Sequence, residues 1–359
     1  MQIPLIQSNF KLIAHWLLGH PLARNRSRRI LMHGFSDKYK SFPEYIIGIT
    51  KEIWEERGIS TLHEYYAPNI IVRSPGSIVI GNEKVIAATM ATLAEFPDRT
   101  LYGEDVIWSG TPEEGMLSSH RLHSTATHSR PGIYGEPTGK KLNYRIIADC
   151  HARNNQIDDE WLIRDQGAIV RQLGIPPKDY ARGLIEKEGG AENCVKPFVP
   201  KDDIKGPYSG SGNDNEWGQK FSDILSRIMN ADFAAIPSEY DRAANLEYPG
   251  GISTLSHDGA DQFWMGLRAS FPDAKFEIHH QIGREDPFMP PRAALRWSLY
   301  GKHAGWGSFG APTGAEVYIF GATHVEFGAV SGDTPKIRRE WTLFDETAVW
   351  KQIFLKHGV

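Results

Sequence analysis

The sequence is poor in cysteine, since its 359 residues include only Cys150 and Cys194. Two distant thiols with no second pair cannot build a disulfide framework or a zinc clip, so we expect a reducing cytoplasmic setting. An excess of positive charge is also missing, because the formal net charge is −4, and nucleic acid is therefore not an expected partner. No apolar run approaches the roughly 20 residues that cross a bilayer, so no membrane association is expected.

Several sequence motifs are missing as well. The chain has no Gly-x-Ser-x-Gly elbow, no dinucleotide fingerprint and no GxxxxGK[ST] loop, which argues against serine hydrolase, Rossmann and P-loop chemistry. Residues 1–36 contain no acidic side chain, and most of their positive charge follows the apolar part, which is the wrong order for a secretory signal. We expect residues 1–36 to be an extension outside the fold.

What the sequence does contain is one stretch that occurs twice. His128 is followed nine residues later by Pro137-Thr138-Gly139, and His303 is followed at the same spacing by Pro312-Thr313-Gly314. Both landmarks are displaced by 175 residues, which indicates an internal repeat.

Further landmarks support the repeat. The same displacement relates Phe96-Pro97-Asp98 to Phe271-Pro272-Asp273, and it grows to 180 at the Glu-Trp…Asp runs that end in Asp165 and Asp345. Five residues are therefore inserted in the second copy, most simply between residues 328 and 335. The chain is a tandem duplication of one fold.

Each copy begins with helical patterns and continues as strands. In the first copy, apolar spacing predicts helices near 46–54 and 84–95. A four-strand antiparallel meander should follow at 99–108, 116–128, 141–151 and 159–166. The fold class is α+β, with a first domain at 37–175, a flexible linker at 176–216 and a second domain at 217–359.

Asp165 and Asp345 are the main catalytic candidates. Strand alternation places Asp165 on the same face as Trp161 and Ile163, and burial on such a face raises a carboxyl pKa towards the range that acid/base catalysis needs. Each aspartate also precedes a helical stretch that it could cap, because Asp is a favoured N-cap residue. Both interpretations stay open.

His128 and His303 are expected to assist these aspartates by positioning them or by moving a proton. A metal is not expected, because no second ligand stands at a suitable spacing to either histidine. Large aromatic residues should form the pocket walls. These are Tyr65, Trp108 and Trp161 in the first copy, and Tyr240, Trp297 and Trp341 in the second, where Tyr240 lies 175 residues after Tyr65.

The repeated stretch resembles the SnoaL-like polyketide cyclase branch of the NTF2-like superfamily. The matching elements are the histidine, the Pro-Thr-Gly, the Glu-Trp and the following aspartate in each copy. The resemblance implies two cone folds, each a curved antiparallel sheet wrapped against helices around an apolar cavity. It also implies that the aspartate at position 165 is the acid/base of an intramolecular aldol closure, with the histidine at position 128 nearby and no cofactor.

On this basis the chain is expected to act on a hydrophobic, carbonyl-containing small molecule by cofactor-independent proton transfer, as a cyclase or isomerase. Lyase, hydratase or epoxide-hydrolase chemistry with the same aspartate, and small-molecule binding without catalysis, are the alternatives. Family members of a single unit pair as dimers, so we expect the two copies to form a pseudo-dimer within the chain, and a homodimer of such chains is open.

Overall fold

A computed structural model of the protein describes residues 32–328 and 334–357. Most of the predicted extension, residues 1–31, lies outside the described residues. Phe35 is 8% exposed and packs against the rings of Phe42 and Tyr45. The fold therefore begins before the predicted boundary at residue 37.

The first repeat contains one six-stranded sheet and four α-helices. Its helices are α1 (Phe42–Thr50), which continues into a π-helical turn at Lys51–Glu55, α2 (Leu62–Tyr65), α3 (Asn82–Glu95) and α4 (Gln166–Leu173). Its strands are β1 (Tyr66–Ser74), β2 (Ser77–Ile80), β3 (Thr100–Thr111), β4 (Gly115–Thr127), β5 (Lys141–Arg153) and β6 (Gln156–Arg164).

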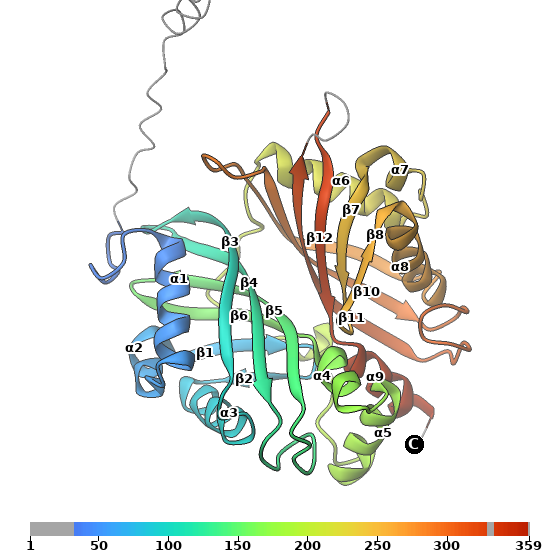
Figure 1. The fold of residues 1–359 in the computed structure, drawn as a ribbon, viewed down its shortest axis with the longest axis horizontal. Coiled ribbons are helices and arrows are strands. Elements are labelled where there is room, and N and C mark those ends of the chain that lie inside the picture. Colours follow the sequence, from blue (N-terminus) through green and yellow to red (C-terminus); the bar gives the residue numbers. More distant parts are fainter. Residues whose placement is uncertain (1–31, 329–333, 358–359) are drawn as a thin grey trace, which may run out of the picture. The chain divides into compact units, whose positions relative to one another are not determined.

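The second repeat follows after helix α5 (Pro177–Lys187) and has the same order of elements. Its helices are α6 (Glu216–Met229), α7 (Ala235–Glu239), α8 (Ser256–Ser270) and α9 (Glu346–His357). Its strands are β7 (Tyr240–Tyr248), β8 (Ile252–Leu255), β9 (Lys275–Arg284), β10 (Arg292–Lys302), β11 (Glu316–Gly328) and β12 (Lys336–Phe344). The repeated element order is visible in Figure 1.

Each sheet is larger than the predicted meander. The strand order is β2-β1-β6-β5-β4-β3 in the first repeat and β8-β7-β12-β11-β10-β9 in the second. Four strands form the expected antiparallel meander, but β1 adds to its end in parallel with β6, and β7 adds in parallel with β12. The predicted meander is therefore confirmed, and what it left out is the pair of strands added beside it, because local periodicity identifies a strand without showing which neighbour it pairs with.

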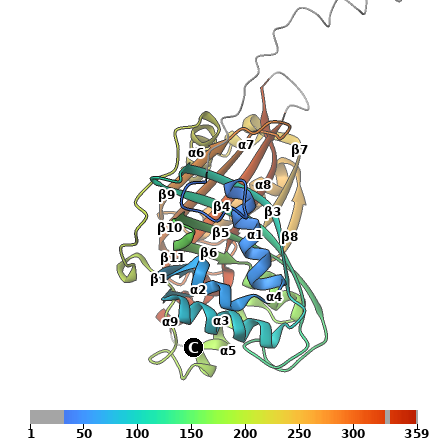
Figure 2. The ribbon, with the colours of Figure 1, turned by 90° about the vertical axis from the view of Figure 1, so that its left-hand side faces the viewer.

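The helices lie on one face of each sheet. In Figure 2, α1, α2 and α3 lie in front of the first sheet. Helix α1 starts where the Ser41 side chain accepts a hydrogen bond from the Glu44 backbone N–H, and it buries Ile46 and Ile49. This covered face is the concave side that can hold a cavity.

The strand register corrects one predicted correspondence and confirms another. Tyr66 pairs with Ile157, and Tyr240 pairs with Ile337 at the equivalent point, so the counterpart of Tyr240 is Tyr66 and not Tyr65. The five inserted residues lie in the β11–β12 hairpin, as expected, and its tip at 329–333 lies outside the described residues.

The two sheets contact each other through the faces that their helices leave uncovered. In this contact an arginine of each repeat packs against a tryptophan of the other. The guanidinium carbon of Arg121 lies 3.5 Å from the ring centroid of Trp341, and that of Arg296 lies 3.8 Å from Trp161. Because Arg121 and Arg296 occupy equivalent positions, as do the two tryptophans, the contact is isologous, as in a twofold dimer. This is the arrangement that a pseudo-dimer within one chain requires.

The symmetry of this contact is broken at its ionic partners. Arg296 donates to the Asp149 carboxylate at 3.0 Å, whereas His324 stands at the equivalent position opposite Arg121, with 3.3 Å between Nη1 and Nδ1. His324 also lies 2.7 Å from the Ser119 hydroxyl. The partners form a buried polar layer between the sheets.

The segment between the repeats is not the free linker that its Gly, Ser and Asn content predicts. Gly212 bridges to Gln281 of edge strand β9, and the N–H of Asn213 donates to the Gln281 carbonyl at 3.0 Å. A Cβ on Gly212 would stand 1.6 Å from that carbonyl oxygen. Glycine is therefore needed there for the close approach of the two backbones.

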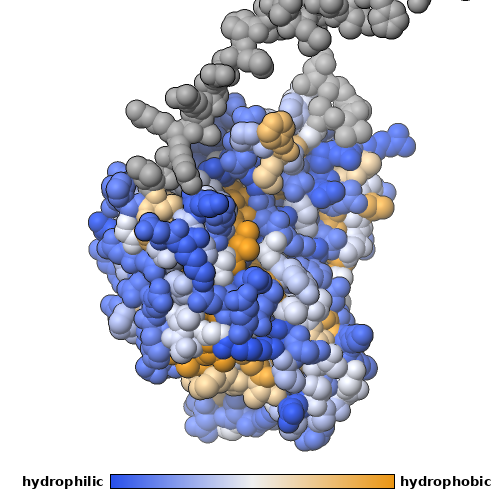
Figure 3. Space-filling model, turned by 60° about the vertical axis from the view of Figure 1, so that its left-hand side comes forward, coloured by the Kyte–Doolittle hydropathy of each residue, from blue (hydrophilic) through white to orange (hydrophobic). Residues whose placement is uncertain are grey.

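The surface drawn in Figure 3 is mostly hydrophilic, with orange in a strip within a hollow, in a patch lower in the view and in smaller areas at the top and right. No helix in the described part of the chain has the length and apolarity needed to cross a membrane.

Candidate functional site

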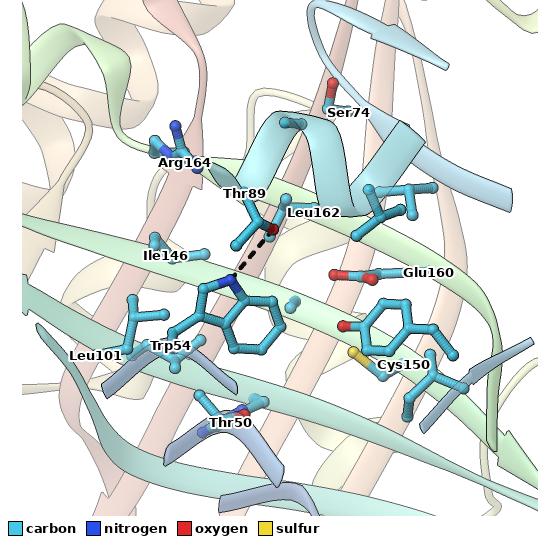
Figure 4. Close-up of a pocket in the computed structure, with 18 of the residues that line it drawn as sticks. Thr50, Trp54, Ser74, Thr89, Leu101, Ile146, Cys150, Glu160, Leu162 and Arg164 are labelled. Atoms are coloured by element: carbon cyan, nitrogen blue, oxygen red, sulfur yellow. Dashed lines mark hydrogen bonds between the residues drawn. The ribbon is translucent and has the colours of Figure 1, made fainter. Parts of the chain in front are cut away.

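The first repeat encloses a cavity of about 190 Å³ between its sheet and helices α1 and α3. Most of its wall is apolar, with Trp54, Leu122 and Ile146 among the larger contributors. The Trp54 indole N–H donates to the Thr89 hydroxyl across 3.4 Å, which fixes the ring at the wall (Figure 4). Such a cavity suits a hydrophobic small molecule.

Glu160 of β6 points into this cavity (Figure 4). Burial raises the pKa of its carboxyl to about 7, and the nearby Tyr66 hydroxyl offsets part of that rise by hydrogen bonding. The carboxyl can therefore exchange a proton near neutral pH, which acid/base catalysis requires.

Glu340 occupies the equivalent position in the second repeat, but hydroxyl groups surround it. Tyr240, Tyr248 and Thr342 donate to its carboxylate at 2.7, 3.3 and 2.7 Å. Burial raises its pKa to about 7 despite these bonds. In the first repeat Ser74 stands in place of Tyr248, so Glu160 has fewer partners and more freedom to meet a ligand.

The Thr342 position shows the same difference, because Leu162 replaces it in the first repeat. Leu162 lines the cavity and has no hydroxyl to donate. The Glu160 carboxylate therefore faces an apolar wall where Glu340 faces a hydroxyl.

Two arginines also line the cavity. Arg99 is 5% exposed, and its Nε donates to the Tyr144 hydroxyl at 3.1 Å. Arg164, four residues after Glu160 on the same face of β6, has a buried Nε with no hydrogen-bond partner. In Figure 4, Arg164 and Glu160 lie at opposite sides of the cavity.

His120 completes the polar groups of the cavity wall. Burial lowers the pKa of its imidazole to about 3, and the neighbouring Arg121 adds to the effect. The ring is therefore neutral at physiological pH. Among the described residues, no three His, Cys, Asp or Glu side chains cluster as metal ligands would.

The structure places Asp165 outside this cavity, at the N-terminus of α4. Its carboxylate accepts hydrogen bonds from the backbone N–H of Ala168 at 2.9 Å, Gly250 at 2.9 Å and Gly251 at 3.0 Å. Burial raises its pKa to about 7, although these donors favour the charged form. Asp165 thus caps its own helix and holds the β7–β8 hairpin of the second repeat.

Asp345 caps α9 in the same way. It accepts from the Thr347 N–H at 2.8 Å and from the Thr347 hydroxyl at 2.7 Å, and burial raises its pKa to about 6. As predicted, Asp165 shares one face with Trp161 and Ile163. That face contacts the second sheet and not the cavity of the first repeat.

The two histidines belong to the Pro-Thr-Gly turns. The Nδ1 of His128 lies 3.1 Å from the Thr138 hydroxyl, and the carbonyl of His128 accepts from the N–H of Gly139 at 2.9 Å. His303 makes the same contacts with Thr313 and Gly314 at 3.1 and 2.8 Å. Within the described residues, neither imidazole hydrogen-bonds to Asp165 or Asp345, so the structure does not bring the predicted pairs together.

The predicted pocket aromatics are also distributed elsewhere, as none of them lines the cavity of the first repeat. Trp161 and Trp341 lie between the sheets, Trp108 packs under Arg284, and the Tyr65 hydroxyl donates to Glu52. Trp297 and Tyr240 are fully buried in the core of the second repeat.

Sequence reasoning missed Glu160, Tyr66, Arg99 and Arg164. The alternation in β6 does place Glu160 and Arg164 on one face, opposite Asp165, but charged residues on a strand are ordinarily read as the solvent side. Here both faces are covered, one by helices and one by the second sheet. Comparison of the two copies could have identified the buried face. Arg164 is replaced by Phe344 in the second copy, and an apolar aromatic at that position indicates a face turned to the interior.

Comparison with known proteins gives matches to structures and to one protein family. Among solved structures, the chain is similar to IdmH from Streptomyces antibioticus, with 23% identity over 37% of this chain and 98% of that one and a TM-score of 0.33. A SnoaL-like polyketide cyclase from Agrobacterium tumefaciens matches at 20% identity over 39% and 98%, with a TM-score of 0.30. TsrD from Streptomyces laurentii matches at 17% identity over 37% and 91%, with a TM-score of 0.31.

A search of curated proteins found no match. The model of the SnoaL-like polyketide cyclase family matches residues 45–173 and again residues 223–353. With most of its length matched and the fold duplicated, this chain belongs to the SnoaL-like polyketide cyclase family, of which it carries two copies in tandem.

Proposed function

We propose that the first repeat catalyses a cofactor-independent proton transfer on a hydrophobic, carbonyl-containing small molecule, with Glu160 as the acid/base. The observation that carries the proposal is a buried carboxyl of pKa about 7 that faces an apolar cavity. Family membership supports cyclase or isomerase chemistry of this kind. Two free, buried cysteines agree with a reducing cytoplasmic setting.

The chemistry needs only the substrate and the carboxyl. The Glu160 carboxylate removes a proton from the carbon next to a carbonyl, and the electron pair moves onto the carbonyl oxygen to form an enolate. In a cyclisation, the enolate carbon attacks a second carbonyl and the resulting alkoxide takes the proton back. In an isomerisation, the proton returns to a different carbon.

The prediction from the sequence, in which Asp165 with His128, or Asp345 with His303, moves the proton, remains the competing assignment. It differs from ours in a way that can be measured, because Asp165 is bonded to three backbone N–H groups whereas Glu160 faces the cavity.

The test follows hydrogen–deuterium exchange at the carbons beside the carbonyl of 2-tetralone, an apolar bicyclic ketone, by proton NMR in D₂O. We expect the wild type to accelerate exchange and Glu160→Gln to lower the rate by about 100-fold or more. The wild-type rate should rise with pH up to about 7 and then level off, because only the carboxylate acts as base.

Glu340→Gln is the matched control, since it changes the equivalent carboxyl of the other repeat and should leave exchange unaltered. Full exchange in Glu160→Gln with loss in Asp165→Asn would move the chemistry to the aspartate. The absence of any acceleration by the wild type would count against proton transfer in this cavity.

A further inference from the structure

The arginine end of the cavity has more positive charge than its surroundings neutralise. Within the described residues, neither Arg99 nor Arg164 has a carboxylate within 4 Å, although the chain contains many other arginine–carboxylate pairs. Arg99 is buried and Arg164 is half-buried with a buried Nε, and a buried charge without a charged partner is destabilising. The wall of the cavity therefore has positive charge that a bound anion could neutralise.

Nearby acidic groups are engaged elsewhere. Glu160 lies four residues before Arg164 on the strand, which separates their Cα atoms by about 13 Å. Asp345 lines a hollow of about 280 Å³ that adjoins the cavity at Arg164 and Leu162, but its carboxylate is bonded to Thr347. Glu188 of the same hollow is paired with Lys351 at 2.6 Å.

The two arginines both act on Tyr144 of β5, which lies between β6, the strand that carries Arg164, and β3, the strand that Arg99 immediately precedes. Burial alone would raise the pKa of this tyrosine, yet the positive charges of Arg99 and Arg164 bring it below its ordinary value. That end of the cavity therefore favours negative charge on whatever group approaches it.

The second repeat lacks both arginines. Their counterparts are Ala274 and Phe344, which are 4% and 3% exposed and belong to a continuous apolar core. The same fold can therefore be built without arginine at either position.

We infer that the cavity of the first repeat binds a hydrophobic molecule carrying a carboxylate, which Arg99 and Arg164 hold at the end opposite Glu160. The inference rests on the proposed function for its reacting end, and it adds the substrate class. The arginines would anchor the carboxylate and leave the apolar body along Leu162 and Ile146, with its carbonyl-bearing end towards Glu160.

The test compares two probes that share a naphthalene ring, 2-naphthoate and its methyl ester, which is neutral and larger by one methyl group, by isothermal titration calorimetry. We expect the wild type to bind 2-naphthoate more tightly than the ester. Arg99→Met and Arg164→Met should each weaken 2-naphthoate by about 10-fold or more, because a charge-assisted hydrogen bond is lost. Binding of the ester should change less than about twofold, because its contacts are apolar.

Arg164→Lys should retain part of the 2-naphthoate affinity because the charge is kept, and Arg153→Met, at an exposed arginine, should retain all of it. Circular dichroism of each variant reports whether the fold is intact. Equal weakening of both probes would show that the arginines only pack, and equal affinity of the wild type for the two probes would also overturn the inference.

Glu160→Gln separates this inference from the proposed function. If this variant keeps both 2-naphthoate binding and 2-tetralone exchange, the carboxylate site stands and the catalytic role of Glu160 fails. If the Met variants lose no preference for 2-naphthoate while Glu160→Gln loses exchange, the proposed function stands and the carboxylate site fails.

Discussion

The two repeats have one fold but differ in what fills their concave side. Lining positions of the first cavity carry larger aromatic residues in the second copy, where Thr89 becomes Trp264, Leu122 becomes Trp297 and Arg164 becomes Phe344. The rings of Trp264 and Trp297 lie 6.0 Å apart, and those of Trp297 and Phe344 lie 6.5 Å apart. The same cone thus has an open interior in one copy and a packed interior in the other.

The strand beneath Trp297 adapts to this filling. Gly321 pairs with Trp297, and a Cβ at Gly321 would stand 2.3 Å from the indole ring. The equivalent residue in the first repeat is Ile146, which lines the cavity opposite the smaller Leu122. Both copies supply residues to the contact between the sheets, but only the second fills its concave side with core aromatics, whereas the first holds a cavity there.

The largest expected effect comes from opening the packed copy. Trp264→Thr, which installs the residue of the first repeat, removes a fully buried ring, and we expect the free energy of unfolding to fall by about 3–5 kcal/mol. Urea denaturation followed by circular dichroism measures it. Thr89→Ser in the first repeat is the control and should cost less than about 1 kcal/mol, because it keeps the hydroxyl that accepts the Trp54 N–H and loses little packing. Similar losses in the two variants would remove the distinction between a packed and an open interior.

A smaller effect should come from pH, and here the two repeats should agree. Glu160 and Glu340 each have a folded-state pKa of about 7, above the ordinary value of 4.5. The folded protein binds these protons more tightly than the unfolded chain, so the associated stability is present at low pH and is lost as pH rises from about 4.5 to 7.

In the wild type, the free energy of unfolding should fall between pH 5 and pH 8. Glu160→Gln and Glu340→Gln should each make that fall smaller by about 3 kcal/mol. Urea denaturation at the two pH values measures the change. Only Glu160→Gln should also slow the exchange of 2-tetralone. An unchanged pH profile in both variants would show that neither carboxyl has a raised pKa.

The smallest effect concerns the aspartates at the helix starts. Asp165→Ala and Asp345→Ala should each lower the free energy of unfolding by about 1–2 kcal/mol, because a helix cap is lost. The loss should be greater for Asp165, which also accepts N–H groups from Gly250 and Gly251 of the other repeat. Thermal denaturation gives the difference between the two variants. Unchanged stability together with lost exchange in Asp165→Ala would favour the catalytic assignment instead.

Much of the architecture could be read from local patterns. The displacement of 175 residues, the later step to 180 and the helix that ends before Phe96-Pro97 all have their expected structural counterparts. The family followed from the same residues. These features depend on neighbours along the chain or on comparison of the chain with itself, so sequence is enough to show them.

The site could not be read in the same way. Alternation places Glu160 and Asp165 on opposite faces of β6, but it does not say which face the helices cover and which face meets the second sheet. The sequence also could not show that the conspicuous His128 and Thr138 hold a turn together, since that bond depends on the folded geometry.

The order of residues along the chain was enough to show that one fold is present twice, that each copy is α+β, and that the family is SnoaL-like. The folded arrangement was needed to show that Asp165 accepts hydrogen bonds from the backbone of the other repeat and that Glu160 lines a cavity. The physical reason is that a carboxyl group takes its chemistry from the groups packed around it, and those groups come from distant parts of the chain.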